Sequence, residues 1–127
     1  MPTILIADDY ATIRSAIRAR FENCSGLLVC GEAVDGVDAI EKAIKLKPDL
    51  ILLDLSMPRM NGLESASVLK GLLPQVRIIA FAMSAEVLGK SLAAAVDIDA
   101  VFAKPGGIEK VVECARALLQ PATAWPS

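Results

Sequence analysis

Five short apolar runs, separated by longer amphipathic stretches, constrain the fold of this chain more than any other feature. Continuous apolar runs of this length are typical of strands that are covered on both faces of a parallel sheet. Strands that alternate with helices join through right-handed crossovers and form a doubly wound α/β fold. The strands are expected at Thr3–Ala7, Leu27–Ala33, Leu50–Leu53, Val76–Phe81 and Ala100–Ala103. The second run is the least apolar, which favours a place near an edge of the sheet.

The amphipathic stretches predict five helices, one after each strand. A helical repeat of apolar residues marks the buried face of four of them. These residues are Ile13, Ala16, Ile17 and Phe21 in the first helix, Val37, Ile40, Ala43 and Ile44 in the second, Leu63, Ala66, Leu69 and Leu73 in the third, and Ile108, Val111, Val112, Ala115, Leu118 and Leu119 in the last. Asp35 is the expected N-cap of the second helix. The fourth helix, about Ala85–Ala95, has the weakest pattern, because Gly89 should cost it about 1 kcal/mol relative to alanine.

Length and composition predict one small cytoplasmic domain. The 127 residues suffice for a single core, and 54% hydrophobic against 4% aromatic residues make that core aliphatic. We expect the domain to span residues 1–120 and a tail, or the start of a linker, to occupy 121–127, where Pro121 and Pro126 oppose a further helix. No apolar stretch has the length of a membrane span, and no basic, cleavable leader precedes the first strand.

Charge and residue types exclude several kinds of chemistry. The formal charge of −2 and the lack of long basic runs argue against direct contact with nucleic acid. The chain has no histidine, which excludes a histidine base, a Ser–His pair and a His-rich zinc site. Cys24, Cys30 and Cys114 lack metal-ligand spacing and are expected to be reduced thiols in or near the core. Any chemistry must therefore use carboxylates and lysine.

Acidic residues and a lysine stand at the ends of three apolar runs. Asp8 and Asp9 follow the first run, Asp54 the third, and Lys104 the fifth. Because ligands of such sheets bind at the carboxyl ends of the strands, these side chains should lie close together. Magnesium prefers oxygen ligands, so Asp9 is a candidate for direct coordination and Asp8 for coordination through water. Asp54 is a candidate nucleophile, since carboxylates can form aspartyl-phosphates whose charge a metal and Lys104 would neutralise.

Taken singly, these residues have ordinary structural explanations. Asp8 or Asp9 could cap the following helix, Asp54 could be a loop acid, and Lys104 could be a solvated lysine. Their joint placement at three strand ends favours a site for a divalent cation and a phosphoryl group.

Three segments, in this order, resemble the receiver domain of bacterial two-component response regulators over about residues 3–119. They are Ile4–Asp9, the stretch Asp54–Gly62 with the pattern Asp-x-x-Met-Pro-x-x-Asn-Gly, and Lys104–Pro105. The resemblance implies a flavodoxin-like fold, in which five helices surround a five-stranded parallel sheet of order 2-1-3-4-5.

The same resemblance implies a role for each matching residue. The implied Mg²⁺ ligands are Asp8, Asp9, Asp54 and the main-chain carbonyl of Ser56. Asp54 corresponds to the phosphoacceptor of the family. Lys104 corresponds to the lysine that pairs with the phosphoryl group, and the bond from that lysine to the residue at Pro105 is often cis in the family.

Two positions depart from the family pattern. Ala82 replaces the Ser or Thr at the end of the fourth strand, and Val101 replaces the aromatic residue three positions before the lysine. Phe102 is displaced by one residue and therefore belongs to the opposite strand face. Ser84 could reach the phosphoryl group from a shifted loop, although a role as N-cap of the fourth helix is the simpler interpretation. We therefore expect the phosphorylation chemistry to survive and the usual switch to be impaired.

The resemblance also implies partners. A histidine kinase or a phosphotransfer protein would donate the phosphoryl group, an unidentified downstream partner would read the change, and a homodimer could form through the fourth and fifth helices. Such a receiver catalyses only its own phosphorylation and dephosphorylation and is not otherwise an enzyme.

The sequence fits other function classes less well. The main alternative is a pseudo-receiver, a protein-interaction module that works without phosphorylation, which Ala82 and Val101 favour and the retained acids and lysine oppose. A haloacid-dehalogenase-like phosphatase would need a second acid where Ser56 stands. A flavin carrier of the same fold would need a phosphate-binding loop where Asp8 and Asp9 would repel phosphate.

Overall fold

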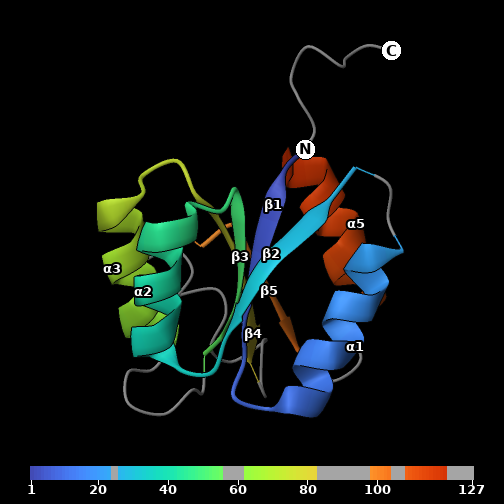
Figure 1. The fold of residues 1–127 in the computed structure, drawn as a ribbon, viewed down its shortest axis with the longest axis horizontal. Helices are drawn as coiled ribbons and strands as arrows, with labels where there is room; N and C mark the ends of the chain where they lie inside the picture. The colour runs from blue at the N-terminus through green and yellow to red at the C-terminus, as the bar shows by residue number, and fades with distance from the viewer. Residues whose placement is uncertain (24–25, 56–61, 83–97, 104–107, 120–127) are drawn as a thin grey trace.

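The computed structural model describes residues 1–23, 26–55, 62–82, 98–103 and 108–119. They form a five-stranded parallel sheet with helices packed on both faces (Figure 1). The strands are β1 (Thr3–Ala7), β2 (Leu28–Ala33), β3 (Leu50–Asp54), β4 (Arg77–Ala82) and β5 (Ala100–Ala103). The helices in this part of the chain are α1 (Ala11–Glu22), α2 (Gly36–Leu46), α3 (Gly62–Leu72) and α5 (Ile108–Leu119).

The sheet topology confirms the strand order expected from the sequence. The order is β2-β1-β3-β4-β5, every neighbouring pair is parallel, and β2 lies at an edge. The limits of β1 and β5 agree with the prediction, whereas β3 continues to Asp54 and β4 runs to Ala82. The fourth helix, expected at about Ala85–Ala95, falls outside the described residues.

Side chains alternate along the strands and build a core on each face of the sheet. Helices α2 and α3 cover one face, and α1 and α5 cover the other (Figure 1). On the face of α2 and α3, the buried residues include Leu5, Ala7, Ala39, Ala43, Ile51, Leu53, Ala66, Leu69, Ile78 and Ala80. On the face of α1 and α5, they include Ile4, Ile6, Ile17, Phe21, Leu50, Leu52, Ile79, Phe81, Val111 and Val112. Both cores are mainly aliphatic, as the composition predicts.

Where side-chain burial is described, the buried faces of the helices agree with the apolar repeat except at two positions, and the predicted Leu63 and Ile108 lie outside that description. Ile17 and Phe21 are buried in α1, but Ala16 is exposed, so the face that meets the sheet is narrower than the repeat suggests. Ile44 is 50% exposed in α2, where the small side chains of Ala39 and Ala43 make the contact with the sheet instead. Those small residues let the helix lie close to the strands.

The N-cap of α2 and the state of two cysteines also follow the predictions. The side chain of Asp35 accepts a hydrogen bond from the main-chain N–H of Asp38 at 2.8 Å. Cys30 and Cys114 are half-buried free thiols, and burial raises the pKa of each, which keeps them protonated at neutral pH. Cys24 lies outside the described residues. Within the described part of the chain, no helix combines the length and apolar character needed to cross a membrane.

Candidate functional site

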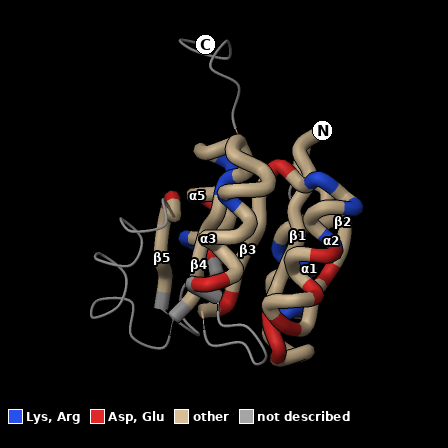
Figure 2. Tube along the Cα trace, turned by 90° about the vertical axis from the view of Figure 1, so that its left-hand side faces the viewer, with Lys and Arg blue, Asp and Glu red and all other residues tan. Residues whose placement is uncertain are grey.

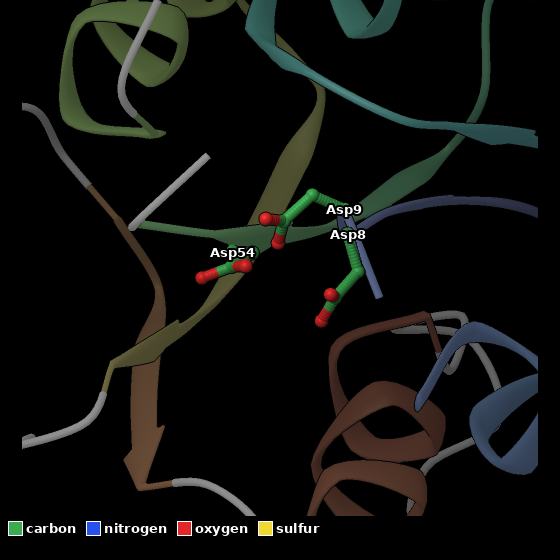
Figure 3. A group of neighbouring side chains, drawn as sticks. All are labelled: Asp8, Asp9 and Asp54. Carbon is green, nitrogen blue, oxygen red and sulfur yellow. The ribbon is translucent and has the colours of Figure 1, made fainter. Parts of the chain in front are cut away.

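Three carboxylates gather at the carboxyl edge of the sheet, as the sequence predicts. Asp8 and Asp9 directly follow β1, and Asp54 is the last residue of β3 (Figure 3). One oxygen from each carboxylate lies within 4.8 Å of the other two. Asp8 and Asp54 are each 1% exposed, whereas Asp9 is open to solvent. Figure 2 shows acidic segments at the ends of β1 and β3 that lie farthest from the N-terminus.

The strand register explains why these acids meet. Strands β1 and β3 are adjacent and parallel, and their last paired residues are Ala7 and Leu53. The next residue in each segment is an aspartate, so Asp8, directly after β1, and Asp54, the last residue of β3, lie side by side. The carboxylate of Asp9 points toward Asp54 (Figure 3).

The structure holds Asp8 by its main chain as well as by its side chain. The N–H of Asp8 donates to the carbonyl of Ala33 on β2 at 3.0 Å. Its Oδ1 accepts from the N–H of Tyr10 at 2.8 Å, and its carbonyl accepts from Nη1 of Arg14 at 2.7 Å. The acidic turn between β1 and α1 is therefore tied to β2 and to the first turn of α1.

Electrostatics at the site favour a cation. Burial raises the pKa of Asp9 above its ordinary value of 3.8, and a hydrogen bond to Asp54 together with repulsion from that carboxylate raises it further. Like charges held this close repel unless a proton or a metal ion lies between them. Three carboxylate oxygens are also the hard ligands that Mg²⁺ prefers. The donor set and its electrostatics therefore fit a Mg²⁺ ion.

The two positions that the resemblance assigns to a switch, Ala82 and Val101, lie on the expected strands. Ala82 is the last residue of β4 and pairs with Ala103 of β5. Val101 packs with the core under α2 and α3, whereas Phe102 packs with the core under α1 and α5. The predicted displacement of the aromatic residue to the opposite strand face is thus confirmed.

Four predicted site residues cannot be placed. Ser56, Ser84, Lys104 and Pro105 lie outside the described residues. Because β5 ends at Ala103, Lys104 is the first residue after that strand.

Sequence reasoning missed Arg14 and Glu32, which flank the acidic turn. Arg14 contacts the main chain of Asp8, and its Nε lies 3.0 Å from Oε1 of Glu32 on β2. A charged residue one position before the end of an otherwise apolar strand was the available signal. The role of such a charged residue depends on which helix packs beside the strand, and residue spacing does not predict that packing.

The family of the chain follows from comparison with known proteins. The model of the response regulator receiver domain matches residues 4–116. The match covers most of the chain, including all of β1 but its first residue, all of β3 and the three clustered acids. The chain belongs to the response regulator receiver domain family.

Individual relatives agree with this assignment. The nitrate/nitrite response regulator NarL of Escherichia coli strain K12 is 43% identical over 82 residues, which are 65% of this chain and 38% of NarL. The protein-glutamate methylesterase/protein-glutamine glutaminase of Pyrococcus horikoshii is 40% identical over 83 residues, which are 65% of this chain and 23% of that enzyme. The match therefore spans well under half the length of either curated relative.

A solved structure gives the same fold. The isolated REC domain of RcsB from Salmonella enterica serovar Typhimurium, in the presence of the phosphomimetic BeF3−, superposes with a TM-score of 0.83 at 27% identity. The match covers 92% of this chain and 87% of that domain.

Proposed function

We propose that this receiver accepts a phosphoryl group on Asp54 in a Mg²⁺-dependent reaction, with a histidine kinase or a phosphotransfer protein as donor. The observation that carries the proposal is the cluster of Asp8, Asp9 and Asp54, with oxygens within 4.8 Å at adjacent strand ends. The RcsB receiver, which shares the fold, was solved in the presence of a phosphomimetic. That relative supports a phosphoryl site in the same kind of domain.

The transfer itself needs little from the protein beyond position and charge. An oxygen of ionised Asp54 attacks the phosphorus of the donor, and the bond from phosphorus to the leaving group breaks as the acyl phosphate forms. The leaving group departs with the bonding electrons. Lys104 would pair with the phosphoryl oxygens from the end of β5. Hydrolysis later returns Asp54 to a carboxylate.

The metal ligands are the proposed family set: Asp8, Asp9, Asp54 and the main-chain carbonyl of Ser56. When bound, Mg²⁺ supplies positive charge to the phosphoryl oxygens. Asp8 is fixed by hydrogen bonds to Tyr10 and Arg14, so its carboxylate is positioned in advance. Such preorganisation lowers the cost of ordering the site during the transfer.

The modified receiver would change its binding to a downstream partner in the cytoplasm, and a homodimer is one candidate form. We propose no enzymatic activity for this chain beyond its own phosphorylation and dephosphorylation. Ala82 and Val101 replace the usual switch residues, so the coupling from Asp54 to the partner surface should be weaker than is usual in the family.

The direct test is the intact mass of the protein after incubation with acetyl phosphate and Mg²⁺. The parent should gain the mass of one phosphoryl group, and Asp54→Asn, which keeps the size of the side chain, should gain none. When a chelator removes Mg²⁺, the parent should no longer gain the mass of a phosphoryl group.

An unmodified, folded parent in the presence of Mg²⁺ would contradict the proposal. It would favour the alternative of a pseudo-receiver that binds partners without phosphorylation. A gain of mass in both the parent and Asp54→Asn would show that another residue accepts the phosphoryl group.

A further inference from the structure

A pair of arginines on α1 faces the edge strand β2 beside the acidic turn. Nε of Arg14 lies 3.0 Å from Oε1 of Glu32, and Nη1 of Arg18 lies 2.7 Å from Oε2 of the same carboxylate. Burial alone would raise the pKa of Glu32, but the hydrogen bonds from Arg18 and Arg14 outweigh it and lower that pKa. Glu32 is therefore ionised at neutral pH and holds both arginines.

Only one of these two arginines also reaches the site. Nη1 of Arg14 donates to the carbonyl oxygen of Asp8 at 2.7 Å, while the second partner that the structure gives Arg18 is Glu22 of its own helix. The Arg14 side chain is 15% exposed and that of Arg18 is 35% exposed. Arg14 thus links the edge strand to the acidic turn, and Arg18 does not.

The atom that Arg14 binds determines what it can control. The carbonyl of Asp8 belongs to the peptide group that joins Asp8 to Asp9, and this group is planar. A guanidinium held on that oxygen fixes the plane and, with it, the direction in which Asp9 leaves the main chain. Because Arg14 donates to the main-chain carbonyl of Asp8, this contact does not use a carboxylate oxygen of the cluster.

We propose that Arg14 is a positioning residue for divalent-cation binding, acting through the Asp8–Asp9 peptide group while Glu32 holds its guanidinium in place. The inference rests on the proposed Mg²⁺ site. It adds a second requirement for cation binding besides the three carboxylates. The turn that carries Asp8 and Asp9 must be held in the right orientation by Arg14 and by Glu32 on the edge strand β2.

Charge and position act in opposite directions at Arg14. Removal of a positive charge near three carboxylates should by itself favour Mg²⁺, whereas loss of the bond to Asp8 should disfavour it. Arg18→Ala is the matched control, because it removes the same charge from the same Glu32 without touching Asp8. Arg14→Lys keeps the charge but lacks the planar fork that donates to two partners at once.

The experiment measures the Mg²⁺ dissociation constant of the folded parent, Arg14→Ala, Arg14→Lys and Arg18→Ala by isothermal titration calorimetry at neutral pH. We expect Arg14→Ala to bind Mg²⁺ about tenfold more weakly than Arg18→Ala, the lower end of the usual effect of residues that orient metal ligands. Arg14→Lys should also bind more weakly than the parent despite its charge. Thermal unfolding of each variant separates this effect from lost stability.

Equal Mg²⁺ affinities for Arg14→Ala and Arg18→Ala would overturn the inference and leave the metal site intact. A lower melting temperature for Arg14→Ala with parent-like affinity would reduce Arg14 to a structural residue. A parent that binds no Mg²⁺ would overturn the inference together with the proposed metal dependence. Arg14→Lys keeps the test decisive if Arg14→Ala does not fold, because it retains the charge and most of the aliphatic stem.

Discussion

At the scale of single residues, the ionised carboxylate of Asp9 destabilises the folded protein when no metal is bound. Its carboxyl meets that of Asp54, and its pKa is raised above the ordinary value. A raised pKa in the folded state favours folding at low pH, and this contribution is lost as the pH rises from about 3.8 through the raised value. The acids that make the site useful therefore oppose folding at neutral pH until a cation is bound.

Replacement of Asp9 should remove this cost. Without metal at pH 7, Asp9→Asn should raise the free energy of unfolding by less than about 1 kcal/mol, since Asp9 is exposed and its interactions are screened. The advantage over the parent should shrink as the pH falls through the raised pKa of Asp9, because Asp9 then takes up a proton in the parent. Urea unfolding with a chelator, at several pH values, measures both effects.

Saturating Mg²⁺ supplies the control for this prediction. Bound metal should stabilise the parent and reverse the order of the two proteins, because Asp9→Asn lacks one of the proposed ligands. An advantage for Asp9→Asn that is the same at pH 4 and pH 7 would show that repulsion between carboxylates is not its cause.

The same scale shows what residue patterns can predict. The three acids were predictable because each follows an apolar run, and parallel strands bring their carboxyl ends to one edge. The contact between Arg14 and Asp8 was not predictable, since it depends on how α1 lies against β2. A hydrogen bond to a main-chain carbonyl cannot be predicted from the pattern of side chains, because every residue has such a carbonyl.

At the scale of elements, the boundaries of strands depend on pairing more than on composition. Asp54 was expected to follow β3, yet it pairs with Phe81 of β4 and belongs to the strand. The N–H of the next residue, Leu55, also donates to the carbonyl of Phe81 at 2.9 Å. Pairing with the neighbouring strand β4 thus extends β3 to include Asp54, a polar residue that the apolar pattern places outside the strand.

Two glycines at element boundaries should respond in opposite ways to the same substitution. Gly71 lies in the last turn of α3 with no atom in the way of a Cβ, so Gly71→Ala should stabilise the protein by about 0.5 kcal/mol. Gly26 has a φ of +88°, where a side chain is strained, so Gly26→Ala should destabilise it by about 1 kcal/mol.

Denaturant unfolding of these two variants checks the prediction. Neither residue lies in the acidic cluster, so Mg²⁺ affinity should match that of the parent in both and serves as the control. Stabilisation by Gly26→Ala would show that the turn before β2 relaxes to an ordinary conformation.

At the scale of the whole molecule, the sheet separates two cores, and the adjacent residues Val101 and Phe102 of β5 face different ones. Val101 faces the core of α2 and α3, and Phe102 faces the core of α1 and α5. The alternation of a strand made this division predictable from two adjacent residues. A phosphoryl group at Asp54 could change the packing of either core. The outcome depends on how the packed elements are coupled, and the order of residues alone does not determine that coupling.

Restoring a hydroxyl at Ala82 should strengthen the coupling between Asp54 and the rest of the domain. A hydrogen bond to a charged acceptor is worth roughly 1.5–3 kcal/mol, which is comparable to the free energy that biases many two-state switches. In Ala82→Thr, phosphorylation should therefore change amide hydrogen exchange more than it does in the parent.

Ala82→Val is the matched control, because valine has nearly the shape of threonine and no hydroxyl. Phosphorylated Ala82→Val should respond like the parent. Equal responses from the Thr and Val variants would mean that the missing hydroxyl does not limit the switch.

The edge strand β2 also has a consequence for self-association. Between Ile4 and Leu5 of β1 the pairing shifts from Val29 to Gly31, a register shift of the kind that a bulge makes, with Cys30 as the extra residue. A bulge twists an edge strand, and the charged Glu32 near its end makes the strand still less suitable as a template for another chain. The ion pairs of Arg14 and Arg18 with Glu32 therefore lie at an edge whose register shift and charge disfavour pairing with another chain.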